Sequence, residues 1–200
     1  MTVADPYPVL DVPLPGTWVV LDLTEAGRLM SDIDAVASSV GPAGAAKHEH
    51  LRNALIDGAT DAIGMEACMW ALCLEIAPGV RVPMSLAVCW PRTPLTFTED
   101  MPTHVTASML EALADTGHEP HDADAAIVRP SSAVVRRVEE VVRDVDGDPF
   151  PFLDVDHWVL VAGAQHPARV FVTVPADDSA PDLLAMLDEM IGSIEWHEPN

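Results

Sequence analysis

Two stretches near the end of the chain decide its fold: DVDHWVLV at Asp154–Val161 and RVFVTV at Arg169–Val174. In both stretches successive side chains point in alternation to two opposite faces, so that every second residue belongs to the same face, which is typical of a β-strand. The intervening segment from Gly163 to Pro167 favours a turn. We therefore predict a β-hairpin over this part of the chain.

The segment after the hairpin has helical periodicity. Ser179 is in position to cap its first turn, with Asp182 three residues later as in a capping box. The predicted buried stripe consists of Leu183, Leu187, Met190, Ile191 and Ile194. We expect an amphipathic helix that ends near Trp196.

At the other end of the chain, four prolines in residues 1–16 favour an extended N-terminal arm. A short strand is predicted at Thr17–Leu23. Thr24 is then a suitable N-cap for a helix whose apolar residues recur at helical spacing, and the Gly41-Pro42 pair ends it.

A second helix is predicted from Ala43 to about Ile63, and a second hairpin follows it. Alternating residues at Cys68–Ile76 and again at Met84–Trp90 indicate two strands, with a turn at Pro78-Gly79 between them. One face of this hairpin carries large apolar residues such as Trp70 and Leu72, and the other face is small and weakly polar, which predicts that helices cover the sheet on two sides.

Two segments in the middle of the chain carry weaker signals. A short helix is predicted within residues 105–117. The valines of Val134–Val145 recur at helical spacing, but a run of β-branched residues favours a strand. We predict a strand there, with a helix as the alternative.

Together these elements predict an α/β fold of the α+β type, with a mainly antiparallel sheet flanked by helices on both faces as in a sandwich. A length of 200 residues suits a single domain over residues 1–200, and the extended arm forms its first 16 residues. The hydrophobic share of 49% is enough for a folded core.

The formal net charge of −22, from 32 acidic and 10 basic residues, bounds the choice of partner. Such a surface repels phosphate backbones, so we expect no nucleic-acid binding. The densest basic segment interleaves both signs of charge and predicts a self-compensated face: Arg136, Arg137, Glu139, Glu140, Arg143 and Asp144. The overall charge favours a basic protein partner, although it also fits a plain solvated exterior.

Cysteine usage and the N-terminus indicate the compartment. Cys68, Cys73 and Cys89 form an odd set without a CxxC pair, and all three lie in apolar runs, which predicts buried free thiols in a reducing compartment. The N-terminus has no basic segment followed by an apolar one, and no apolar run approaches the length of a membrane span. We expect a cytoplasmic protein without a membrane span, and export without a leader stays open.

The C-terminal strands DVDHWVLVAG and ARVFVTVP, followed by a helix closing on SIEW, resemble a group of uncharacterised actinobacterial proteins. The resemblance is carried by Asp156, Trp158, Thr173, Pro175, Ile191, Ile194 and Trp196. By analogy, such proteins are similar to the PsbP-like class of α/β/α sandwiches. That resemblance implies a binding or assembly factor without catalytic residues, and some actinobacterial members of the class are associated with secretion systems.

Two polar segments are weak candidates for metal binding: His118, His121, Asp122 and Asp124 in one loop, and Asp144, Asp146 and Asp148 in another. The first offers the nitrogen and oxygen ligands of zinc, and the second begins like a calcium loop. An EF-hand is excluded, because Pro149 stands where the loop needs glycine and Val155 where it needs glutamate. We predict solvated loops at both places and assign no metal site.

The sequence contains no G-x-S-x-G elbow and no glycine-rich phosphate loop, so we predict no catalytic residues and no cofactor. Trp70, Trp90 and Trp158 lie in predicted strands and are expected in the core. Trp18 and Trp196 lie near the edges and are the candidates for an interface anchor.

The function expected from the sequence is that of a non-catalytic acidic protein that binds a basic partner, as an immunity protein, a chaperone or a secretion or assembly factor. One alternative is a small metal-dependent enzyme or metal-binding protein using the two polar loops. Another is a self-assembling structural subunit, for which homo-oligomers would have to overcome the repulsion between acidic copies.

Overall fold

The computed structural model describes residues 9–23, 25–40, 45–90, 121–122, 124–128, 132–145, 147–161 and 167–197. Its strands are β1 (Val9–Asp11), β2 (Thr17–Leu21), β3 (Ala67–Glu75), β4 (Ser85–Cys89), β5 (Ala125–Val128), β6 (Ser132–Val145), β7 (Asp148–Val161), β8 (Ala168–Pro175) and β9 (Glu195–His197). Its helices are α1 (Ala26–Val40), α2 (Ala45–Gly64) and α4 (Ala180–Gly192).

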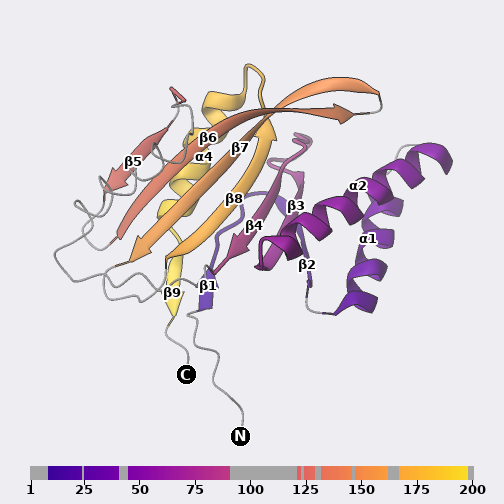
Figure 1. The fold of residues 1–200 in the computed structure, drawn as a ribbon, viewed down its shortest axis with the longest axis horizontal. Coiled ribbons are helices and arrows are strands. Elements are labelled where there is room, and N and C mark those ends of the chain that lie inside the picture. Colours follow the sequence, from indigo (N-terminus) through magenta and orange to yellow (C-terminus); the bar gives the residue numbers. More distant parts are fainter. Residues whose placement is uncertain are drawn as a thin grey trace, which may run out of the picture.

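The described strands form a seven-stranded antiparallel sheet and a small ribbon. The sheet has the order β2-β3-β4-β8-β7-β6-β5, and the ribbon pairs β1 with β9. Helix α4 covers one face of the sheet, and α1 with α2 covers part of the other (Figure 1). The predicted fold class, an antiparallel sheet with helices on both faces, is confirmed.

The C-terminal hairpin that decides the fold is present as predicted. Strands β7 and β8 pair antiparallel, with Leu153 opposite Val174 at one end and Val159 opposite Ala168 at the other. Directly opposed residues share a face, so the apolar phases of both strands lie together against α4. Of the predicted turn, residues 163–166 lie outside the described part of the chain.

The segment predicted as a strand with a helical alternative is strand β6. It pairs with β7 along its whole length, from Ser132 opposite Val161 to Val145 opposite Asp148. Val134 and Val138 are buried on the α4 side, and Val135 is buried on the opposite side. The pairing with β7 therefore uses the β-branched residues better than a helix would.

Helix α4 confirms the predicted apolar stripe except for Ile194, which lies beyond the helix and is partly buried, and it does not confirm the predicted ends. Leu183, Leu187, Met190 and Ile191 are buried. Ser179 occupies the N-cap position without a side-chain bond to the helix, because its hydroxyl donates to Asp177 Oδ1 at 2.5 Å. The predicted capping box is therefore wrong.

The predicted end of this helix near Trp196 is also wrong. The helix ends at Gly192, where Ser193 Oγ donates to the carbonyl oxygen of Glu189 and competes with helix continuation. The chain then turns and Trp196 pairs with Leu10 in the β1-β9 ribbon. The extended N-terminal arm is thus a short strand at residues 9–11, and residues 1–8 lie outside the described part.

The remaining predicted elements of the first half are confirmed where the structure describes them. Helices α1 and α2 are present, whereas the cap at Thr24 and the stop at Gly41-Pro42 fall outside the described residues. Strands β3 and β4 form the second hairpin, and Gly79 has a φ of +77° in the turn bridged by Ala77 and Val80. The helix predicted within 105–117 lies outside the described part.

Each face of the sheet has its own apolar cluster. On the side that we call the α4 face, Leu86, Val155 and Val172 pack against Leu187 and its neighbours. The side that we call the α2 face carries a smaller cluster, in which Ile33 and Ala59 belong to the helices and Leu21, Trp70 and Ala87 to the sheet. The sheet is thus buried from both sides at β3 and β4.

The cysteines correct one sequence expectation. Cys73 and Cys89 are buried free thiols as predicted, but Cys68 is exposed. Cys68 lies where the β3-β4 register shifts between Ala67 and Met69, so the irregular pairing turns its side chain out of the apolar alternation. Burial raises the pKa of the Cys89 thiol to about 11, which makes that sulfur a poor nucleophile.

Candidate functional site

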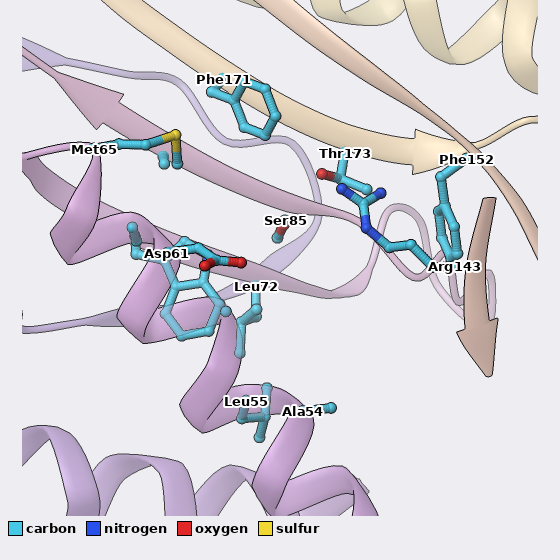
Figure 2. Close-up of a pocket in the computed structure, with 14 residues that line it drawn as sticks. Ala54, Leu55, Asp61, Met65, Leu72, Ser85, Arg143, Phe152, Phe171 and Thr173 are labelled. Atoms are coloured by element: carbon cyan, nitrogen blue, oxygen red, sulfur yellow. The ribbon is translucent and has the colours of Figure 1, made fainter. Parts of the chain in front are cut away.

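A cavity of about 260 Å³ opens on the α2 face, between helix α2 and the sheet (Figure 2). Its lining comes from α2 and from strands β3, β4, β8, β7 and β6. The cavity forms because α2 covers the β3-β4 part of this face while β6 and β7 continue beyond the helix. We take this cavity as the candidate functional site.

The close approach of α2 to the sheet depends on Gly58. A Cβ atom at this position would lie 2.8 Å from the indole of Trp70, closer than real Cβ contacts allow. Glycine therefore lets the helix rest on the buried tryptophan, and Trp70 becomes part of the inner wall of the cavity.

Apolar side chains make up most of the cavity wall. Leu72 and Phe171 line it on the sheet, while Leu55 lines it on α2 and Met65 in the turn that follows this helix. Phe152 extends the wall along β7, where its ring lies 5.2 Å from that of the partly exposed Phe150. The result is an apolar strip that runs from the cavity outward along the sheet.

The polar groups at one end of the cavity are paired with one another. Arg143 donates from Nη2 to both oxygens of Asp154 at 2.8 Å, and its guanidinium lies 5.5 Å from the centre of the Phe152 ring. Thr173 Oγ1 donates to the same carboxylate at 3.0 Å. These contacts fix Arg143 and leave Asp154 with both oxygens hydrogen-bonded.

A second polar network, centred on Asp156, lies beside Phe171. Arg169 donates to the two oxygens of Asp156 at 2.7 and 2.9 Å, and Trp158 Nε1 donates to Asp156 Oδ2 at 3.2 Å. The guanidinium lies 5.4 Å from the Trp158 ring and 5.9 Å from the Phe171 ring. Burial acts to lower the pKa of Arg169, but the hydrogen bond and charge of Asp156 outweigh it and raise the pKa.

The arginines of β6 are compensated, but mostly by partners outside their own segment. Arg137 pairs with Glu139 as the sequence suggested, at 3.2 Å. Arg143 binds Asp154 on β7, and Arg136 binds Asp188 on α4. The prediction of a self-compensated face is wrong in this respect, because alternate residues of a strand point to opposite faces and meet different elements.

On the α4 face, the described residues include a polar cluster around His157. This imidazole is fully buried, and its Nε2 lies 3.6 Å from Asp188 Oδ1. Burial acts to raise the pKa of Asp188, but His157 and Arg136 beside it hold that pKa below the ordinary aspartate value of 3.8. The cluster joins β6 and β7 to α4 and is separate from the cavity on the other face.

The first metal candidate is a loop whose aspartate binds the backbone. Asp124 accepts hydrogen bonds from the amides of Val138 at 2.8 Å and His121 at 3.0 Å. The carboxylate thus fastens the start of β5 to β6. Asp122 is exposed beside this loop, and His118 lies outside the described residues.

The second metal candidate is the turn between β6 and β7. Asp144 Oδ1 accepts the Gly147 amide at 2.8 Å, as in an Asx-turn, and Asp148 is exposed. Asp146 lies outside the described residues. Within the part of the chain that the structure covers, no three His, Cys, Asp or Glu side chains come close enough to hold a metal ion.

The tryptophans divide much as their positions suggested. Trp70 and Trp90 are buried, and Trp158 is half-buried in the Asp156 network. Trp18 is half-buried against the α4-face cluster and donates to the Pro15 carbonyl at 2.6 Å. The side chain of Trp196 is outside the description, so the interface role of these two residues stays a prediction.

Sequence reasoning did not find the cavity. Its residues run from Ala54 to Thr173 and come from six elements, so no local spacing connects them. One signal was present: the phase of β7 that carries Phe152, Asp154 and Asp156 mixes aromatic and acidic residues on one face of a strand. Such a face is too polar for a core and too aromatic for a plain solvated surface.

Comparison of the chain with protein-family models, with curated proteins and with solved structures found no match. The similarity to actinobacterial hairpin-helix proteins therefore stays a prediction. Among the described helices none is long and apolar enough to cross a membrane.

Proposed function

We propose that this protein is a non-catalytic acidic binding protein that holds a basic protein partner, in the role of a chaperone, an immunity protein or a secretion or assembly factor. The observation that supports this most is the open apolar cavity on a strongly acidic molecule. Around it, Arg143, Asp154 and Thr173 bind one another and so build a fixed recognition surface.

Charge supports the choice of a basic partner. The chain carries a net charge of −22, which raises the local concentration of cationic partners and speeds their encounter at low salt. Arg143 lines the cavity, and its charge is offset by the two hydrogen bonds that it donates to Asp154. A basic partner therefore meets an arginine that is already paired with a carboxylate.

The β6-β7 hairpin supports contact with a macromolecule. Strand β8 pairs with β7 only from Phe152 to Val159, so the tip of the hairpin projects beyond the rest of the sheet (Figure 1). Val142 is 68% exposed and Phe150 is 38% exposed near this tip. Phe150 lies on the cavity side of the hairpin and Val142 on its other side. Exposed apolar side chains on a projecting arm are typical of a protein-contact surface.

The test is purification of the tagged protein from its own host at low salt, followed by reconstitution with any stoichiometric protein that co-elutes. A basic protein that rebinds in purified form, with an association rate that falls at least about tenfold from low to high salt, supports the proposal. A protein that elutes alone and turns over a substrate or carries a stoichiometric metal ion contradicts it. Light scattering of the same sample separates a complex from a self-assembled oligomer.

A further inference from the structure

We propose that the cavity on the α2 face is the anchor site for one bulky apolar side chain of a partner segment, and that a lysine or arginine flanking this side chain pairs with Asp61. This inference rests on the proposed function and names the part of the partner that the cavity receives.

The size of the cavity points to a side chain. Its volume is about 260 Å³, below the range of roughly 300–1,000 Å³ that is usual for small-molecule and cofactor sites. An apolar cavity of about 150 Å³ accommodates a benzene-sized group. The cavity therefore holds an aromatic or large aliphatic side chain together with the start of its backbone.

The lining is suited to such an anchor. The walls offer Leu72, Phe152 and Phe171 from the sheet, Leu55 from α2 and Met65 from the turn after α2 (Figure 2). Met65 is an unbranched, polarisable side chain that adapts to differently shaped groups. The walls thus favour an apolar group of the right size without demanding one residue type.

The two ends of the cavity differ in charge. At the end near β6 and β7, Arg143 is already held by Asp154 at 2.8 Å. On α2, Asp61 lines the cavity and makes no hydrogen bond or ion pair through its carboxylate with another described residue, and Asp57 is exposed one turn earlier. The charge that remains to be paired at the rim is negative, so the complementary flanking residue on the partner is a cation.

A segment with this composition would enter along the apolar strip formed by Phe152 and Phe150. Phe150 is 38% exposed beside Phe152, so the strip continues from the cavity onto the projecting hairpin. An extended segment can therefore place its anchor in the cavity and its neighbours over the hairpin. Anchors in pockets of this kind carry most of the binding energy of an interface.

The experiment uses the full-length protein and a fluorescent short peptide with a central phenylalanine flanked on both sides by lysines, read by anisotropy. Two comparison peptides replace the phenylalanine by glycine or the lysines by glutamates. We expect binding of the first peptide only. Ala54→Trp, which fills the cavity from an exposed position on α2, should weaken this binding at least about tenfold. Asp61→Asn should weaken it about two- to fivefold.

Matched controls distinguish the cavity from general charge and surface effects. Asn53→Trp adds the same indole on the neighbouring position of α2, outside the cavity lining, and Asp178→Asn removes one charge at the start of α4. Both controls should bind like the unaltered protein. Circular dichroism and thermal melts of all four variants check that each one folds.

The outcomes separate this inference from the proposed function. If the peptide binds equally well to Ala54→Trp, or if a purified basic partner binds while the peptide does not, the cavity is not the anchor site and the proposed function stands. If neither a partner nor the peptide binds at low salt, both proposals are wrong.

Discussion

The two faces of the sheet differ in how completely helices cover them. On the α4 face, alternating valines of β7 and β8 meet a single helix, and side chains such as Val155, Val172 and Leu187 have no exposed surface. On the α2 face the helices cover part of the sheet, and the uncovered part carries aromatic rings and paired charges around an open cavity. The α4 face is closed by apolar packing, and the α2 face leaves a cavity and part of the sheet open.

The largest expected effect tests this difference in stability. Leu187→Ala on α4 should lower the free energy of unfolding by about 3 kcal/mol, because it removes a fully buried side chain and leaves a void. Leu51→Ala on α2 is the matched change on the other face, where the side chain is only partly buried; it should cost about 1 kcal/mol. Urea unfolding followed by circular dichroism measures both.

Equal losses for the two variants would contradict the comparison, because they would show that the α2 face contributes to the core as much as the α4 face does. A larger loss of stability for Leu51→Ala than for Leu187→Ala would reverse the comparison.

The next effect concerns the contact that shapes the cavity. Gly58→Ala should gain about 1 kcal/mol of helix propensity, but its Cβ would lie 2.8 Å from a ring atom of the buried Trp70. Displacing α2 or the indole costs about 1–3 kcal/mol, so we expect a net loss of about 1 kcal/mol and a changed tryptophan fluorescence. Thermal melts and emission spectra provide the measurement.

Gly27→Ala on α1 is the control for this prediction, since nothing lies within 4 Å of a Cβ at that position. It should stabilise the protein by about 0.5–1 kcal/mol through propensity and unfolded-state entropy. Stabilisation by Gly58→Ala as well would show that α2 does not rest tightly on the sheet.

The same contrast explains what could be predicted from the sequence. The strands of the α4 face were predicted because their signal is local. Valine occupies every second position along much of β8, and this alternation alone identifies a strand with one buried face. The strand β6 was harder, since its valines also fit a helix and only the pairing with β7 decides between the two.

The cavity could not be predicted, because it is a property of long-range packing. Gly58 and Trp70 are adjacent only after α2 has docked, and Arg143 finds Asp154 only through the β6-β7 register. The predicted ends of α4 were wrong for a related reason, because hydrogen bonds of nearby serines decide them. The Ser179 hydroxyl donates to Asp177 and does not accept a hydrogen bond from the first turn of the helix, and sequence spacing does not indicate this choice.

The smallest expected effect concerns the polar cluster of the α4 face and its response to acid. The pKa of Asp188 lies below 3.8 in the folded protein, so the unfolded chain takes up the proton first as the pH falls. The stability that this carboxylate contributes is present above the unfolded value and is lost as the pH falls from about 3.8 through the lower folded value.

Asp188→Asn removes this titration. We therefore expect the variant to be less stable than the unaltered protein at neutral pH, with the difference narrowing in acid. Urea unfolding at a series of pH values between neutral and strongly acidic measures it. The groups facing the carboxylate are Arg136 on β6 and His157 on β7, so a difference that stays constant with pH would mean that these two groups do not favour the charged form of Asp188. In that case the α4 face would owe its stability to apolar packing alone, and the contrast with the charged α2 face would become sharper.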